Sequence, residues 1–500
     1  MINYVSLRGA KATRQSSASK KLDCFAMLAM TILLSSCSLA PDFVLPEVKT
    51  PEHFEQSQIM KAGGANWKVA QSSESVDRGE WWEIFADQTL NELQKQASEA
   101  NNSLAAAAAR VESSRATARA SASTFFPTID LGANAVRSKP ASAASAAFGG
   151  SGAQLKPYTL YSAQAVASYE VDLFGRVRDN EKALISDTES TEAMYKNILL
   201  ALQADVAQHY YYIRALDTER DLLRDTVIIR EEALRIMQKQ FDLGEVGEQD
   251  LSRIKSELAG VKAELLALDR QRTIYENALA VLLGKLPSDF SLAEKPLVGN
   301  PPRIPAGVPS SLLERRPDIS AAISTMQAAN ARIGVARTAY FPILNLTASA
   351  GSSSSELGEL FDWSSRTWAL GQLAGDALSV TIFNDGRTGA RVDAAHATYK
   401  EAVENYRGQV LSAFRDVEDN LSAQRLLSEQ SQMNDEAARS ARRTTEIVLT
   451  RYDEGDVNYF EVVSAWRDTL AAERAAVQVR GQRFVTAIEL IRALGGGWQQ

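Results

Sequence analysis

Cysteine, histidine and, over long tracts, proline are scarce in this chain of 500 residues. It contains 2 cysteines and 3 histidines, and the histidines are too far apart in sequence to suggest a metal site. All 14 prolines lie at or before Pro342, and none falls between Pro157 and Pro287. Because proline interrupts helices, the two long tracts without it predict long helices.

The rest of the composition is typical of a folded protein. Hydrophobic residues make up 45%, charged residues 23% and aromatic residues 7% of the chain. This balance excludes a long disordered or collagen-like protein and allows a large core.

Residues 1–36 read as an export signal. They carry five Lys or Arg and one acid, followed by an apolar run at 24–34 that is too short to span a membrane well. The run ends in Leu34-Ser35-Ser36-Cys37, which resembles the lipobox of bacterial lipoproteins. Cleavage before Cys37 would leave one cysteine, with lipid on its thiol. The alternatives are an ordinary secretory signal and an N-terminal anchor helix.

Loss of this segment changes the formal net charge from −8 to −12, because the segment carries four net positive charges. An acidic mature chain disfavours a nucleic-acid partner. A single mature cysteine excludes an intrachain disulfide.

The chain contains two copies of one unit, 211 residues apart. Phe241 to Val246 (FDLGEV) returns as Tyr452 to Val457 (YDEGDV). Phe126-Pro127 recurs as Phe341-Pro342, four residues out of step, which predicts a length change in the intervening segment. Six prolines between 287 and 309 mark a connector between the copies.

These features divide the chain into five parts. Each repeat is expected to contain a helix, two strands, a long helix and a return helix. The parts are a lipoprotein signal peptide (1–36), an N-terminal lipid-anchored extended arm (37–80), the first repeat (81–286), a Pro-rich connector (287–310) and the second repeat (311–500).

Long helices dominate the expected fold. The 68 residues from Arg176 to Leu243 contain neither glycine nor proline and would measure about 100 Å as one helix. Apolar residues recur here and in the returning segment in steps of three and four, with Arg272 as the one break, which predicts a coiled-coil seam. Placed end to end, Asp87 to Thr124 and Glu248 to Gly284 reach roughly the length of the long helix, so we expect them to stack beside it. An ordinary antiparallel bundle is the alternative.

Four segments alternate apolar and polar residues as strands do. They are Phe125–Ala135, Leu160–Phe174, Leu344–Ala350 and, less regularly, Trp368–Phe383. Runs of about ten residues suit a membrane strand, although a soluble sheet shows the same alternation. Four strands cannot close a barrel and lipid does not tolerate open sheet edges, so several chains would have to pool their strands. The open edges alone do not distinguish a barrel made by two chains from one made by three.

Several longer motifs identify a family. They are residues 37–42 (CSLAPD), 81–90 (WWEIFADQTL), 169–176 (YEVDLFGR), 312–319 (LLERRPDI) and 331–336 (ARIGVA). Together they resemble the outer membrane factor (TolC/OprM-like) family, and more closely its lipid-anchored branch of efflux channel lipoproteins. The resemblance covers nearly all of the mature chain.

The resemblance implies a mixed α and β membrane protein with internal duplication. Each chain of a homotrimer would contribute four transmembrane strands to a 12-stranded barrel, continued by an α-helical coiled-coil barrel. The protein would lie in the outer membrane of a Gram-negative bacterium, held by lipid at Cys37, and extend into the periplasm.

The resemblance also implies the exit duct of a tripartite efflux pump, which passively conducts drugs or other small toxic compounds. Its partners would be a periplasmic adaptor (membrane fusion protein), an inner membrane transporter of the resistance-nodulation-division type, and outer membrane lipid. No cofactor is implied. The alternatives are a type I secretion duct for polypeptides and, in a different class, a periplasmic adaptor or a structural coiled-coil lipoprotein.

The sequence carries no GxSxG, HExxH or phosphate-loop motif, which disfavours an enzyme. The functional candidates lie at the helix turns, where the family closes its periplasmic mouth. By position, Asp250 and Glu461 would line the constriction in rings that favour cations, and Arg451 and Tyr452 would link neighbouring helices. The other two candidates, Asp453 and Asp456, fit a solvated, helix-capping turn equally well.

Overall fold

The computed structural model describes residues 38–48, 54–55, 80–139, 156–302, 304, 315–371 and 378–496. The signal peptide, Cys37 and most of the C-terminal part of the connector lie outside these residues. The chain divides into two compact units, and each combines segments of both repeats. The sheet unit comprises Met1–Leu45, Ser114–Thr188 and Thr325–Val403, and the hairpin unit comprises Pro46–Ser113, Glu189–Ser324 and Glu404–Gln500.

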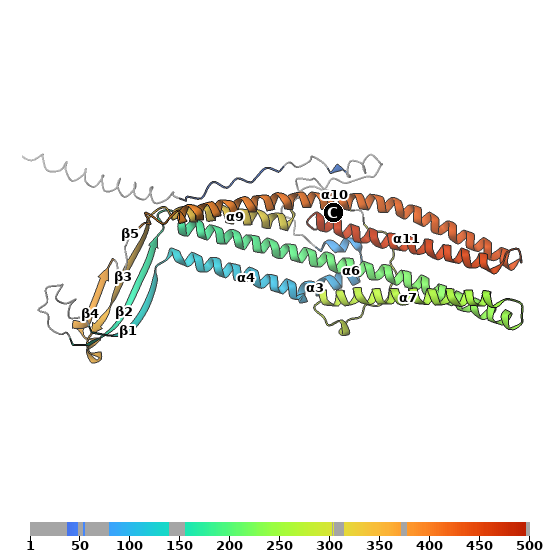
Figure 1. Cartoon of the computed structure of the whole chain (residues 1–500), viewed down its shortest axis with the longest axis horizontal. Coiled ribbons are helices and arrows are strands. Elements are labelled where there is room, and N and C mark those ends of the chain that lie inside the picture. Colours follow the sequence, from blue (N-terminus) through green and yellow to red (C-terminus); the bar gives the residue numbers. More distant parts are fainter. Residues whose placement is uncertain are drawn as a thin grey trace, which may run out of the picture. The chain divides into compact units, whose positions relative to one another are not determined.

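The sheet unit is built on one antiparallel sheet (Figure 1). Its strands are β1 (Thr128–Ser138), β2 (Tyr158–Val171), β3 (Ile343–Ser354), β4 (Arg366–Leu370) and β5 (Leu378–Ser379). The order is β1-β2-β3-β4, and β5 also pairs with β3. β2 and β3 therefore join the two repeats at the centre of the sheet. The three regular alternating segments of the sequence correspond to β1, β2 and β3.

The fourth expected strand is not continuous. Ala348 pairs with Leu370 in β4, whereas Leu344 pairs with Leu378 in β5. Four residues along β3 thus correspond to eight along its partner, so four extra residues interrupt the pairing. Alternation in a single sequence does not reveal such an insertion, because each half keeps its own period of two.

The helices reproduce the duplication residue by residue. α6 (Arg176–Asp242) and α10 (Arg387–Asp453) each have 67 residues, and α7 (Glu248–Leu282) and α11 (Tyr459–Ala493) each have 35. The members of each pair begin 211 residues apart, but β1 and β3 begin 215 apart. The expected length change is confirmed between these strands and the long helices.

The segment from Asp87 to Thr124 is two α-helices rather than one. α3 (Gln88–Ala100) ends before Asn101, whose extended backbone separates it from α4 (Asn102–Ala122). The Asn101 Oδ1 accepts the N–H of Leu104 at 3.0 Å and so caps α4. The Asn101 Nδ2 donates to the carbonyl of Leu282 at 2.9 Å, which satisfies the end of α7. The returning helix therefore meets the helix pair at this break.

The second repeat makes the same junction with a different residue. α9 (Pro317–Thr338) begins just after Arg316, whose Nη1 donates to the carbonyl of Ala493 at 3.0 Å. Ala493 lies 211 residues after Leu282, and Arg316 lies 215 after Asn101. Two chemically different side chains thus satisfy equivalent carbonyls at the ends of α7 and α11.

The main core of the hairpin unit is formed by aromatic and aliphatic residues of α3, α6, α7 and α11. Tyr211 stacks on Phe484 with ring centroids 4.4 Å apart, and Trp81 in the short helix η1 (Trp81–Phe85) is buried beside them. A smaller cluster with Leu223 and Leu268 continues the contact of α6 with α7. The apolar stripes in the sequence mark this seam correctly.

The break in the stripe at Arg272 is part of a buried charge cluster. Asp217 on α6 accepts from Arg272 Nε at 2.7 Å and from Arg214 Nη1 at 3.2 Å, and its side chain is 1% exposed. Both arginines also donate to main-chain carbonyls of the segment 292–295, and Asp217 accepts the N–H of Lys295 at 3.1 Å. The cluster thus holds the start of the connector against the first hairpin.

Candidate functional site

Each long helix ends in the same reversal before its return helix. Gly244 and Gly455 have φ of +82° and +84°, a left-handed conformation that favours glycine. The Gly455 N–H donates to Tyr452 and the Asp456 N–H donates to Arg451, both at 2.9 Å, which is the Schellman arrangement. The first hairpin makes the equivalent bonds after α6. Both turns therefore have the same backbone, as their sequence similarity indicates.

Asp250 and Glu461 occupy equivalent positions at the third residue of α7 and α11. Negative charge is favourable at a helix N-terminus, so both acids also stabilise the start of their helices. Asn458 caps α11 by accepting the Glu461 N–H at 3.3 Å, whereas Gly247 precedes α7 without a side-chain cap. The structure brings each acid to the first turn of a return helix, at a hairpin end.

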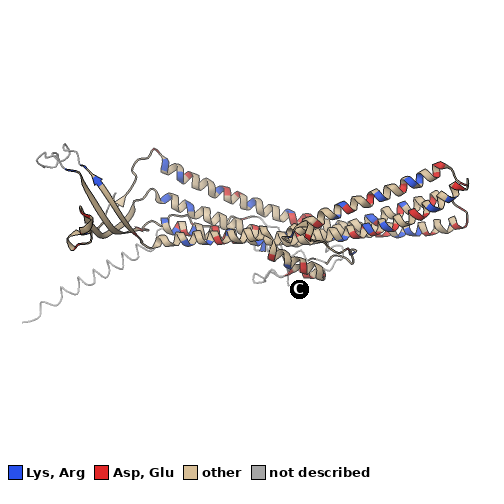
Figure 2. Ribbon diagram, turned by 90° about the horizontal axis from the view of Figure 1, so that it is seen from below, with Lys and Arg blue, Asp and Glu red and all other residues tan. Residues whose placement is uncertain are grey.

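The other candidates lie on the second turn; Figure 2 shows charged residues along the helices and at the hairpin ends. Arg451, Asp453 and Asp456 are exposed. Within the described part of the chain, neither Arg451 nor any of the four candidate acids forms an ion pair. Charged groups at this end are thus available to solvent in the single chain.

Tyr452 is half-buried and contacts Tyr459 edge to face, with ring centroids 5.7 Å apart. Tyr459 in turn packs against the cluster of Met237, Leu251 and Ile254 in the first hairpin. Burial and then the neighbouring Tyr452 raise the pKa of Tyr459 to about 12, so its hydroxyl stays protonated at neutral pH. Tyr452 therefore reaches the other hairpin through Tyr459.

A second contact between the hairpin ends was not found from the sequence. The Arg253 guanidinium lies 4.9 Å from the centroid of the Phe460 ring, a cation–π contact between α7 and α11. The Tyr459-Phe460 pair directly after the turn was the available signal. These aromatic residues join the two hairpins at the end that carries the candidate acids.

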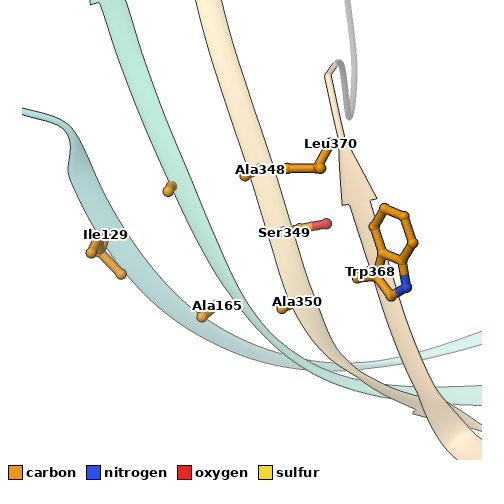
Figure 3. Close-up of a pocket in the computed structure, with 8 residues that line it drawn as sticks. Ile129, Ala165, Ala348, Ser349, Ala350, Trp368 and Leu370 are labelled. Carbon is orange, nitrogen blue, oxygen red and sulfur yellow. The ribbon is translucent and has the colours of Figure 1, made fainter.

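The sheet presents chemically different faces. On one face Thr128 bonds to Ser168 at 2.7 Å and Ser162 bonds to Asn134 at 2.5 Å, between β1 and β2. The opposite face is apolar and contains a shallow groove of about 330 Å³. In Figure 3 alanines of β2 and β3 lie between Ile129 and the pair Trp368 and Leu370. One apolar and one polar face is the pattern of a strand that separates lipid from water.

None of the described helices combines the length and hydropathy of a membrane span. Among the described residues there is also no group of three or more His, Cys, Asp or Glu placed to hold a metal ion.

Comparison with known proteins gives matches over both repeats. The sequence model described as outer membrane efflux protein matches residues 93–285 and 308–496. The toluene efflux pump outer membrane protein TtgF of Pseudomonas putida is 32% identical over 480 residues, which cover 94% of this chain and 96% of that protein.

Solved structures agree. The CmeC outer membrane channel of Campylobacter jejuni superposes with a TM-score of 0.85 at 26% identity, covering 93% of this chain and 96% of that one. The open state of the MtrE outer membrane channel of Neisseria gonorrhoeae gives 0.77 at 28% identity, covering 92% and 98%. The resemblance inferred from the motifs is thereby confirmed, and with it the outer membrane location and the role of an efflux pump exit duct: this chain belongs to the outer membrane efflux protein family.

Proposed function

We propose that three copies of this chain form the duct. The observation that carries this proposal is the two-faced sheet, in which β1 and β4 each pair on one side only within the described residues. In a bilayer these edges need partners, and strands of neighbouring copies supply them. Three copies with four strands each would make a 12-stranded barrel with its polar face inward.

The trimer is tested by the mass of the purified protein in detergent. Native mass spectrometry is expected to give a trimer, and cysteines placed on β1 and β4 are expected to crosslink between copies. A monomer, or crosslinks only within one chain, would contradict the proposal.

We further propose that the duct receives its cargo from a periplasmic adaptor and an inner membrane transporter of the resistance-nodulation-division type. The family membership supports this assembly, and the name of the relative TtgF points to small apolar toxic compounds. The chain has no motif for nucleotide hydrolysis, so the transporter would supply the energy.

Deletion of the gene is expected to raise accumulation of toluene or a fluorescent dye, and the cloned gene is expected to reverse this. In vivo crosslinking should recover an adaptor and a transporter. Loss of a secreted polypeptide with unchanged dye accumulation would instead favour a type I secretion duct.

The hairpin ends are proposed to close the periplasmic mouth of the duct. Asp250 and Glu461 would form acidic rings, while Arg451 and Tyr452 would hold neighbouring helices together, with Asp453 and Asp456 at the rim. The equivalent placement of the two acids supports this assignment.

A variant with Arg451→Ala and Tyr452→Phe is expected to admit large antibiotics in cells that lack the adaptor. Glu436→Gln, an exposed acid on α10 paired with Arg439, serves as the control. Unchanged antibiotic entry and unchanged pump-dependent resistance would exclude these two residues from the gate.

Cys37, outside the described residues, is proposed to carry the lipid. Mass spectrometry of the N-terminal peptide is expected to show a thioether-linked diacylglycerol. An unmodified thiol would contradict this.

A further inference from the structure

The residues that directly follow Cys37 are docked in the sheet unit. We name residues 38–41 the N-terminal strap. Its main-chain carbonyls at Leu39 and Pro41 accept from Arg337 Nη1 at 3.1 Å and from Asn330 Nδ2 at 2.7 Å, both on α9. Two side chains of one helix thus bind alternate carbonyls of the strap, and the Asn330 side chain is buried.

The strap also meets the first turn of α6. Ser38 Oγ donates to Asp179 Oδ1 at 2.7 Å and accepts the N–H of Ala40 at 3.2 Å. Asp179 is fully buried. A carboxylate is costly to bury, so it requires donors on both oxygens.

One of these donors is missing from the described residues. Asp179 Oδ2 is buried and has no hydrogen-bond partner among them. Arg337, a cation that the strap contacts, donates to the carbonyl of Leu39, and its Nη2 lies 3.2 Å from His396 Nε2. Ser38, which binds the other oxygen of this carboxylate, is joined covalently to Cys37.

The opposing helix leaves room for this carboxylate. Gly334 on α9 faces Asp179, and a Cβ at this position would overlap Asp179 Oδ2 and lie 2.8 Å from Ala40. The glycine in the motif 331–336 is therefore required by the contact between strap and carboxylate, and its φ is not positive.

We propose that Asp179 and Gly334 form the binding site for the mature amino terminus. Asp179 Oδ1 holds Ser38, and Oδ2 accepts a hydrogen bond from the main-chain nitrogen of Cys37 after signal cleavage. The lipid therefore leaves the fold at one fixed point beside α6 and α9, and not from a loose tether. This inference rests on the proposed cleavage and lipidation at Cys37.

Hydrogen exchange of the purified full-length mature protein, followed by mass spectrometry, tests the site. In Asp179→Ala the peptide covering the strap is expected to exchange about tenfold faster or more, while peptides of β1 and β2 keep their protection. Gly334→Ala on α9 should also release the strap, because its Cβ would overlap Asp179 Oδ2 and crowd Ala40. Asp187→Ala removes the exposed ion pair with Arg332 on the same two helices and should leave the strap protected.

Unchanged strap exchange in Asp179→Ala would overturn the proposal, as would equal release in Asp187→Ala. A chain that carries Cys37→Ser behind an ordinary cleavable signal separates the two claims. It cannot be lipidated but keeps the main-chain nitrogen, so the strap should remain protected; loss of protection would show that lipid, and not Asp179, fixes the terminus. Absence of lipid on the wild-type Cys37 would refute the lipidation alone.

The same samples show the chemical form of the Cys37 nitrogen. A free ammonium and an acylated amide both donate to Asp179 Oδ2, and the mass of the N-terminal peptide distinguishes them. Either form supports the site if Asp179→Ala releases the strap.

Discussion

The two helical hairpins share a backbone and differ in the chemistry at their middle. Arg214 and Arg272 of the first hairpin are matched, 211 residues later, by Arg425 and Arg483. Asp217, which joins the first two arginines, is matched by Ser428.

This difference shifts the pKa values of the matched Arg272 and Arg483 in opposite directions. Burial lowers the pKa of Arg272, but the hydrogen bond and charge of Asp217 outweigh it, so the net shift is upward. Burial lowers the pKa of Arg483, which contacts Asn300 at 3.3 Å and Ser431 at 3.2 Å rather than an acid. Duplication thus preserved helix lengths and arginine positions, while an acid joins the two arginines in the first hairpin and a serine occupies that position in the second.

The largest expected effect comes from Asp217→Ala. It leaves two buried arginines without their shared partner, which typically costs about 3–5 kcal/mol. Thermal or denaturant unfolding in detergent, at matched protein concentration, measures the loss. Ser428→Ala at the equivalent position should change the free energy of unfolding by less than about 0.5 kcal/mol. Equal effects at the two positions would remove the proposed difference between the hairpins.

Glycines at helix ends give a second, smaller contrast. Gly284→Ala places a Cβ against the carbonyl of Ala100 at a φ of +67°, so we expect a loss of about 3 kcal/mol. Gly244 has open space around it, and alanine there should cost only the conformational term of about 1 kcal/mol. Equal losses at the two glycines would show that close packing at the α3–α4 break is unimportant.

The smallest effect concerns pH. Hydrogen bonds from Arg224, then from Arg220, lower the pKa of Glu294 to about 2 from 4.5. A lowered pKa stabilises the folded state above about pH 4.5, and this contribution is lost as pH falls toward 2. Because the Glu294 side chain is 46% exposed, Glu294→Gln should cost less than about 1 kcal/mol near pH 7.

The measurement is denaturant unfolding of both proteins between pH 7 and pH 2. The difference in stability between them should shrink toward pH 2, and near pH 7 it should be smaller in an Arg224→Gln background. A difference independent of pH would contradict the role of the ion pairs.

Periodicity and duplication in the sequence were enough to predict the long helices, their returns and the three regular strands, because these elements are set by local patterns. The break at Asn101 was missed, since an asparagine within an Ala-rich run satisfies a carbonyl 181 residues away. The interrupted fourth strand was missed for a similar reason, because its register depends on pairing with β3. Arg272 was recognised as an exception, but only the fold shows Asp217 beside it.

The candidate site was predicted in part. Sequence similarity placed the gate candidates at two equivalent turns, which the structure confirms as turns. The Arg253–Phe460 contact and the Asp179–Gly334 site were not predicted, because each joins segments whose proximity no local pattern indicates. Whether the acids act as a gate depends on copies of the chain around an axis, and that remains a prediction.

The most direct test of the duct and its acidic gate is the single-channel conductance of the purified protein in a planar bilayer. Wild type is compared with the Asp250→Asn/Glu461→Gln variant, and Glu436→Gln is the control. The account predicts a small, cation-favouring wild-type conductance that increases and loses selectivity in the double variant alone. Equal conductance in all three proteins would contradict the acidic gate, and absence of a pore in all of them would contradict the duct.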